Sequence, residues 1–100
     1  MAQHVTFFRM NVQPGKMDEM MQLMREDSSA MAAKGFERSI AGKSKDDPNE
    51  VWVAVTWDTS ERYYANADSP EQSADYERMR ALLTADPEWH DCDVLAEDSA

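Results

Sequence analysis

Two different spacings of hydrophobic residues divide the chain into strand-like and helix-like segments. Alternation, together with β-branched and aromatic side chains, predicts four strands, over residues 4–12, 36–43, 51–57 and 89–96. The segment 51–57, VWVAVTW, carries the strongest strand pattern of the four. In the second strand, Phe36 and Ile40 are expected to lie on one face of the sheet.

One long helix is predicted from Met17 to Lys34, because methionines recur there at helical spacings. The resulting apolar stripe consists of Met17, Met20, Met21, Met24 and Met31. Asp18 and Glu19 in the first turn and Lys34 in the last turn all interact favourably with the helix dipole. Gly35 is placed to end the helix. We expect the methionines to pack in the core, where they could also line an adaptable pocket.

Two further helix starts follow the third strand. The sequence DTSE at 58–61 is able to cap a short helix that runs through residue 66. The sequence SPEQ at 69–72 places serine at the cap, proline at the first helical position and glutamine three residues after the serine. The helix that it opens is predicted to run to about residue 84, before the break at Asp86-Pro87.

The order of these elements, β-α-β-β-α-β, is that of the split βαβ or ferredoxin-like plan. The sequence therefore predicts an α+β fold in which an antiparallel four-stranded sheet carries the helices on one face. With 100 residues, the chain is expected to form a single domain (1–100) with its core over about 4–96.

Two helices can cover only one face of such a sheet. We interpret the face that carries Trp57 as the covered one, since it holds the larger apolar set and leads into the helices. The side chains left on the other face are Val5, Phe7, Trp52 and Ala54. Burying a large apolar side chain is worth about 1.5–3 kcal/mol, so leaving all of them exposed to water, as in a monomer, is unfavourable. The sequence predicts a homodimer through this face, or, alternatively, a cover formed by the loop 43–50 or the C-terminal tail.

The net charge of the chain limits the kinds of partner that it is expected to bind. Twenty acidic and ten basic residues give a net charge of -10, which disfavours binding to nucleic acid and to anionic membrane surfaces. No apolar stretch approaches the roughly 18 residues of a membrane span, and the first residues lack the pattern of a secretory signal. The single cysteine, Cys92, cannot form an internal disulfide. We therefore expect a cytoplasmic protein with neither a nucleic-acid nor a membrane partner.

Several sequence features together resemble those of a known family. The first strand ends in Val-x-Pro-Gly at 12–15, Gly35-Phe36 opens the second strand, and the third ends in Trp57. Tyr63 follows six residues later, and Ser69-Pro70 begins the last helix. Over nearly the whole chain, this pattern resembles the antibiotic biosynthesis monooxygenase family of dimeric α+β barrel proteins. The resemblance implies a fold in which two sheets form a dimeric barrel.

The resemblance also implies a chemistry. Members of the family that act as cofactor-free monooxygenases oxidise polycyclic phenols, anthrones or quinols with molecular oxygen. Trp57 matches a tryptophan whose indole N–H is a donor, Tyr63 a pocket tyrosine, and Arg80 an arginine seven residues before the closing proline, Pro87. Where those oxygenases carry an asparagine four residues before the tryptophan, this chain has Val53.

On this basis we expect a pocket between sheet and helices for a planar aromatic or quinol-type substrate. Trp57 and Arg80 would stabilise its anion and Tyr63 would orient it. The other expected lining residues are Phe8, Met10, Val53 and Tyr76. The alternative is a non-catalytic, ligand-binding or stress-associated dimer, in which Trp57 is a core residue and Arg80 forms a surface ion pair with Glu77. A cavity of about 300 Å³ or more beside Trp57, with Arg80 pointing in, would favour a ligand site.

No cofactor or metal is expected. His90 and Cys92 alternate on one strand face and His4 lies on the first strand, whereas a metal site needs three or four converging ligands. The haem-degrading branch of the same scaffold requires a histidine on the last helix, and the segment 70–84 contains none.

Overall fold

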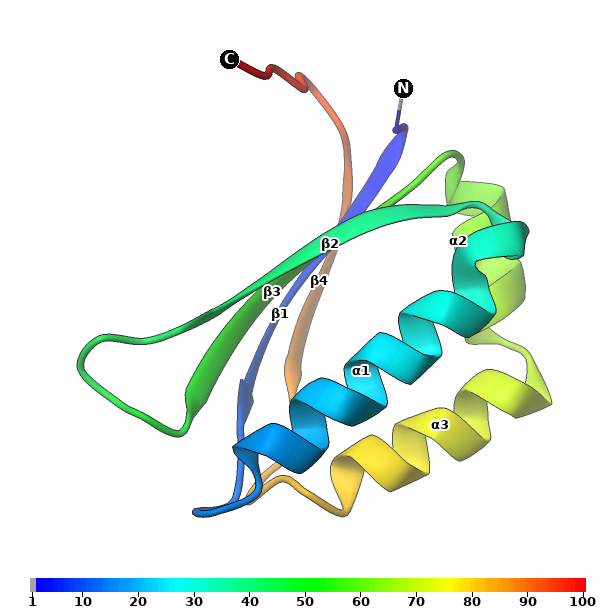
Figure 1. The fold of residues 1–100 in the computed structure, drawn as a ribbon. Helices are drawn as coiled ribbons and strands as arrows, with labels where there is room; N and C mark the ends of the chain where they lie inside the picture. Colours follow the sequence, from blue (N-terminus) through cyan, green and yellow to red (C-terminus); the bar gives the residue numbers. More distant parts are fainter. Residues whose placement is uncertain (1) are drawn as a thin grey trace.

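A four-stranded antiparallel sheet with helices on one face forms the computed structural model, which describes residues 2–100 (Figure 1). The strand order is β2-β3-β1-β4. The elements are β1 (His4–Asn11), α1 (Met17–Met31), a 3₁₀ turn (Ala32–Lys34), β2 (Phe36–Lys43), β3 (Glu50–Trp57), α2 (Ser60–Ala67), α3 (Pro70–Arg80) and β4 (Glu88–Asp93). The predicted ferredoxin-like α+β fold is confirmed. In none of the helices over these residues are length and apolar character sufficient for a membrane crossing.

The predicted caps of α2 and α3 are present. The Thr59 hydroxyl accepts a hydrogen bond from the backbone N–H of Arg62 and begins α2. The Ser69 hydroxyl accepts one from the backbone N–H of Gln72, and Pro70 occupies the first turn of α3. Each cap satisfies a backbone donor that the helix itself leaves unpaired. The two caps make α2 and α3 separate helices joined by a tight turn.

The last helix and the last strand are both shorter than the pattern predicts. Helix α3 ends at Arg80 rather than near residue 84, because the backbone that follows pairs with the end of β1. The N–H of Gln13 donates to the carbonyl of Leu82, and the N–H of Thr84 donates to the carbonyl of Asn11. This pairing turns Leu83 into the core, where it is 3% exposed. Strand β4 ends at residue 93 rather than 96.

The inner face of the sheet, which the helices cover, carries the core. Strand β1 pairs with β3 so that His4 is opposite Trp57 and Met10 is opposite Val51. The alternating side chains on this face are buried, as predicted for the face with Trp57. The hydrophobic core cluster consists of Phe8, Met10, Val12, Met20, Val51, Val53 and Leu83.

The expectation that Phe36 and Ile40 share a face is wrong, because β2 contains a β-bulge between Phe36 and Arg38. Phe36 pairs with Trp57 and faces inward, whereas Ile40 pairs with Ala54 and faces outward, where it is 74% exposed. An inserted residue reverses the alternation of a strand beyond it. Ile40 therefore belongs to the outer face.

The outer face of the sheet is uncovered in Figure 1, and α1, α2 and α3 all lie on the other side. Phe7 and Trp52 on this face are 46% and 52% exposed, so neither the loop after β2 nor the C-terminal tail covers them. Arg9 lies beside this apolar area, with its guanidinium 5.8 Å from the Trp52 ring and paired with Glu50 and Glu88 at 3.1 and 3.3 Å. The predicted assignment of faces is correct, and the sheet presents an apolar surface with a polar border.

The structure predicts that Gly35→Ala destabilises the fold. Gly35 has a φ of +115°, and an added Cβ would lie 2.5 Å from Asp58 Oδ1. We expect the free energy of unfolding, measured in urea, to fall by more than about 1 kcal/mol. Gly42→Ala is the matched control, because nothing lies within 4 Å of its added Cβ. Equal stability of the two variants would contradict this account of the end of α1.

Candidate functional site

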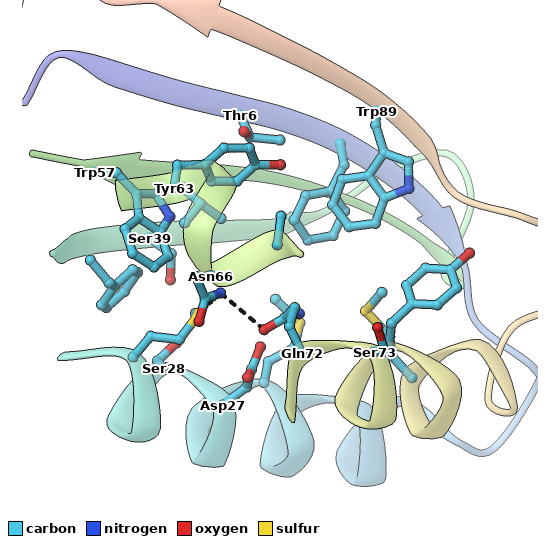
Figure 2. A pocket seen from close by; sticks show the side chains of 18 of the residues that line it. Thr6, Asp27, Ser28, Ser39, Trp57, Tyr63, Asn66, Gln72, Ser73 and Trp89 are labelled. Atoms are coloured by element: carbon cyan, nitrogen blue, oxygen red, sulfur yellow. Dashed lines mark hydrogen bonds between the residues drawn. The ribbon is translucent and has the colours of Figure 1, made fainter. Parts of the chain in front are cut away.

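A pocket of about 610 Å³ lies between the inner face of the sheet and the helices (Figure 2). Its volume falls within the range of roughly 300–1,000 Å³ that is usual for small-molecule sites. Most of its wall is apolar, and each strand as well as α2 and α3 contributes one aromatic ring. The aromatic lining residues are Phe8, Phe36, Trp57, Tyr63, Tyr76 and Trp89.

These rings form two groups at opposite ends of the pocket. At one end Trp57 meets Tyr63 edge to face, with ring centroids 5.9 Å apart. At the other end Trp89 lies 4.5 Å from Phe8 and 6.3 Å from Tyr76. Figure 2 shows the space between Trp57 and Trp89, with the indole nitrogen of Trp57 turned toward the interior. A cavity bounded by rings in this way suits a flat, ring-containing ligand.

A chain of polar side chains, in which His4 and Thr6 are buried, packs against Tyr63. The His4 ring stacks on Tyr63 with centroids 4.1 Å apart. His4 Nδ1 is 3.0 Å from the Ser60 hydroxyl, and Nε2 is 2.8 Å from the Thr6 hydroxyl, which donates to Asp91 Oδ1 at 2.8 Å. Burial lowers the pKa of His4, against the opposing effect of Asp91. At neutral pH His4 is therefore an uncharged ring that uses both nitrogens to fix its neighbours.

Tyr63 is a hydrogen-bond donor rather than a base. Burial raises the pKa of its phenol to about 12, and the nearby Asp91 carboxylate acts in the same direction. A phenol with that pKa keeps its proton throughout the physiological range. Its hydroxyl lies next to Thr6 in Figure 2.

The helices contribute a second polar group to the pocket, opposite the sheet. The Asn66 amide donates to Gln72 Oε1 at 3.2 Å and to Met31 Sδ at 3.4 Å. Figure 2 shows Asn66, Gln72 and Asp27 side by side on the helical side of the pocket. Two amides and one carboxyl therefore lie opposite the aromatic rings of the sheet.

Asp27 is a partly buried carboxyl in the pocket wall, and its pKa is raised. Its Oδ1 is buried and, over residues 2–100, is the only such side-chain atom without a hydrogen-bond partner. Burial raises its pKa to about 6, and the carboxyl of Asp75 adds to this, while Arg78 and Gln72 act in the opposite direction. The pKa of Asp75 is lowered, by its bond to Arg78 and by Asp27, against the effect of burial. As the pH rises, Asp75 therefore loses its proton before Asp27 does.

The structure brings together four of the residues proposed from the sequence. Trp57, Tyr63, Phe8 and Tyr76 all line the pocket. Met10 and Val53 do not: they are 1% and 3% exposed within the core cluster, on the part of the inner face that the helices cover tightly.

Arg80 also lies outside the pocket lining, contrary to our expectation that it points in. Its Nε donates to Asp86 Oδ1 at 2.7 Å, and its Nη1 donates to the carbonyl of Leu83 at 3.4 Å. The early end of α3 explains this, because the turn that follows brings both acceptors to Arg80. Its partner is Asp86 rather than the Glu77 that spacing suggested.

The polar lining residues that the sequence analysis missed include Asp27, Asn66 and Gln72. A signal for Asp27 was present, because it lies seven residues after Met20 and four before Met31, on the apolar stripe of α1. A carboxyl on such a stripe is a departure from amphipathic patterning that calls for an explanation. Asn66 and Gln72 carried no comparable signal, since both occur near helix ends.

Over the described residues 2–100, no three His, Cys, Asp or Glu side chains converge in a way that could hold a metal ion. His90 and Cys92 lie on the outer face, opposite Phe7 and Val5, whereas His4 lies on the inner face, opposite Asp93.

The sequence profile of the antibiotic biosynthesis monooxygenase family matches residues 4–78, and the chain belongs to this family. This match confirms the family that the sequence motifs indicate. No curated protein matches the chain in sequence.

Solved structures share the fold at low sequence identity. A mutant of SnoaB, a cofactor-independent oxygenase from Streptomyces nogalater, has a TM-score of 0.80 at 20% identity over 96% of this chain and 97% of that one. A proposed antibiotic biosynthesis monooxygenase from Chloroflexus aurantiacus J-10-fl has a TM-score of 0.78 at 22% identity over 98% of both chains. A conserved protein from Methanosarcina mazei Go1 has a TM-score of 0.79 at 14% identity over 92% of both. These likenesses establish the fold.

The raised pKa of Tyr63 is directly measurable. We expect the phenolate absorbance that Tyr63→Phe removes to appear with a midpoint near pH 12, above the ordinary value of about 10. The same titration in urea, where burial is lost, should return the midpoint to about 10. A midpoint near 10 in the folded protein would show that Tyr63 is not buried against Asp91 as described.

Proposed function

We propose that this protein is a cofactor-independent monooxygenase that acts on a planar aromatic phenol, quinol or polyketide-type substrate in the pocket beside Trp57. The observation that carries the proposal is the pocket itself, which combines aromatic rings at both ends with polar groups along the helices. Membership of the family supports the same reaction class. SnoaB, which shares the fold, is a cofactor-independent oxygenase.

The proposed chemistry places modest demands on the protein. An acidic hydroxyl or activated C–H group of the substrate loses a proton, and the resulting electron-rich anion passes an electron to molecular oxygen. Hydrogen-bond donors in a pocket shielded from water stabilise that anion and the peroxide that follows. The Trp57 indole N–H and the Tyr63 hydroxyl are donors of this kind in the lining.

The amides of Asn66 and Gln72 compensate for Val53, which replaces the asparagine of the family's oxygenases. Val53 is part of the core and has no polar atom to offer. Asn66 and Gln72 supply amide groups to the same cavity from the helical side, and the bond between them orients both. The substrate anion would thus be held from a different wall of the pocket.

We also propose that two copies of the chain associate through the outer faces of their sheets. Phe7, Ile40 and Trp52 there are 46%, 74% and 52% exposed. Ala54 lies between Phe7 and Ile40, and Val5 follows Phe7 on the same face toward the start of β1. Contiguous apolar area of this kind marks an interaction surface, and the polar border around Arg9 is typical of an interface rim. Two sheets packed in this way would form the dimeric α/β barrel.

Oxygen uptake tests the catalytic proposal. With anthrones and naphthohydroquinones as substrates, we expect Trp57→Phe and Tyr63→Phe each to lower kcat/KM, by on the order of 10²-fold where the lost donor faces the anion. Tyr63→Phe keeps the ring and removes only the hydroxyl, whereas Trp57→Phe keeps an aromatic ring but removes the indole N–H together with part of the ring volume. Tyr64→Phe is the matched control, because Tyr64 neighbours Tyr63 and lies outside the pocket lining.

Unchanged turnover in both variants would overturn the assignment of Trp57 and Tyr63. A wild-type protein that binds these compounds without consuming oxygen would instead favour the non-catalytic ligand-binding alternative.

Sedimentation tests the association of the sheets. We expect the wild type to sediment at micromolar concentration as a dimer and Trp52→Glu as a monomer, because a carboxylate in an apolar interface loses its hydration. Ala30→Glu adds the same charge to an exposed position of α1 and should remain dimeric. A wild-type monomer would overturn the proposal.

A further inference from the structure

The carboxyl of Asp27 is in an unusual position for a charged group. It lines the pocket from α1, on the stripe otherwise formed by Met20, Met24 and Met31. Its Oδ1 is buried without a hydrogen-bond partner, and over residues 2–100 it is alone in this. A carboxylate oxygen left unpaired costs free energy, and such groups are retained where a ligand or a reaction uses them.

We propose that Asp27 is the catalytic base of the pocket: its carboxyl, which lines the cavity, accepts the hydrogen bond, and then the proton, of an acidic hydroxyl group on the bound aromatic ligand. This inference rests on the proposed function and deepens it. In the step, the ligand O–H bond breaks, its electron pair stays on the ligand oxygen, and the proton forms a new bond to the Asp27 carboxylate. No oxidant or reductant takes part until oxygen reacts with the anion.

The other candidate groups are less suited to this role. Tyr63 keeps its proton up to a pKa of about 12 and is therefore a donor. His4 lies outside the lining, and both of its ring nitrogens are engaged, with Ser60 and Thr6. Glu77 lines the pocket but is exposed to solvent. Asp27 combines partial burial with a place in the lining, and its Oδ1 has no hydrogen-bond donor to satisfy it.

The groups packed against Asp27 place its affinity for a proton in a useful range. Burial and, from α3, Asp75 raise its pKa, whereas Arg78 and Gln72 lower it, and Lys34 acts indirectly by lowering the pKa of Asp75. The resulting pKa of about 6 leaves Asp27 ionised at neutral pH and still basic enough to take up a proton. Because the two carboxyls interact, the titration belongs to the Asp27–Asp75 pair.

A ligand that binds without reacting tests Asp27 as a hydrogen-bond acceptor separately from its role in catalysis. We choose 2-naphthol, a planar phenol that stays neutral from pH 5 to 8, and follow its affinity by quenching of tryptophan fluorescence. As Asp27 ionises above its pKa of about 6, binding to the wild type should tighten about tenfold, since a hydrogen bond to a charged acceptor is the stronger kind. In Asp27→Asn the affinity should be independent of pH. A wild-type affinity that is also flat, or no binding, would overturn the proposal.

Measurements of turnover test whether Asp27 acts as the catalytic base. In oxygen-uptake assays, kcat/KM of the wild type should fall as the pH drops through about 6, and Asp27→Asn should lose on the order of 10²-fold or more together with this acid limb. Asp75→Asn should move the limb to lower pH, because it removes the neighbour that raises the pKa of Asp27. A purely structural role for Asp27 would not produce that shift. Wild-type turnover in Asp27→Asn would overturn the proposal.

Two controls distinguish a failure of the role of Asp27 from misfolding of the variant and from a failure of the proposed oxygenase activity. Glu26→Gln removes a charge from the adjacent, exposed position of α1 and should leave both readouts unchanged. Asp27→Asn is expected to fold, because a raised pKa means that ionised Asp27 destabilises the native state as the pH rises through about 6. If 2-naphthol binding shows its Asp27-dependent pH response but no phenol or quinol is oxidised, Asp27 stands as the hydroxyl acceptor and only the proposed oxygenase activity is overturned.

Discussion

The antiparallel pairing of β1 with β3 is the constraint on which the rest of the molecule depends. The register runs from His4 opposite Trp57 to Asn11 opposite Glu50, so each strand sends alternate side chains to the same two faces. One face meets the helices and the other meets solvent. A shift of one residue would exchange the two faces and bring Phe7 and Trp52 beneath the helices.

Along the inner face, this pairing also places the packed core toward one end of β1 and the pocket toward the other. Toward the end of β1, Met10 and Val51 are closed off by α1 and by Leu83, which forms a well-packed core. Toward its beginning, Thr6 and Trp57 face the pocket instead. The same methionine helix serves both regions, since its first turns contact the core and its later turns reach the cavity.

The sequence was sufficient for the features that depend on local chemistry. Alternation in β3 identified the inner and outer faces, and Ser69-Pro70 predicted the start of α3, because each pattern acts over a few residues. Features set by contacts distant in sequence were missed. The bulge that turns Ile40 outward and the backbone pairing that removes Arg80 from the pocket both depend on partners in another part of the chain, on β3 and at the end of β1. Asp27 was visible as a carboxyl on an apolar stripe, yet only the folded chain shows that a cavity lies beside it.

The overlap of core and cavity has an evolutionary consequence. Trp57 is 1% exposed and lines the cavity, and Val55 and Met79 pack against the core cluster while they line the cavity as well. Exchanging one of these side chains therefore alters the cavity and the stability of the fold together. Asp27 and Gln72, on the helical wall, are outside the core cluster, so a lineage built on this architecture is freer to vary there.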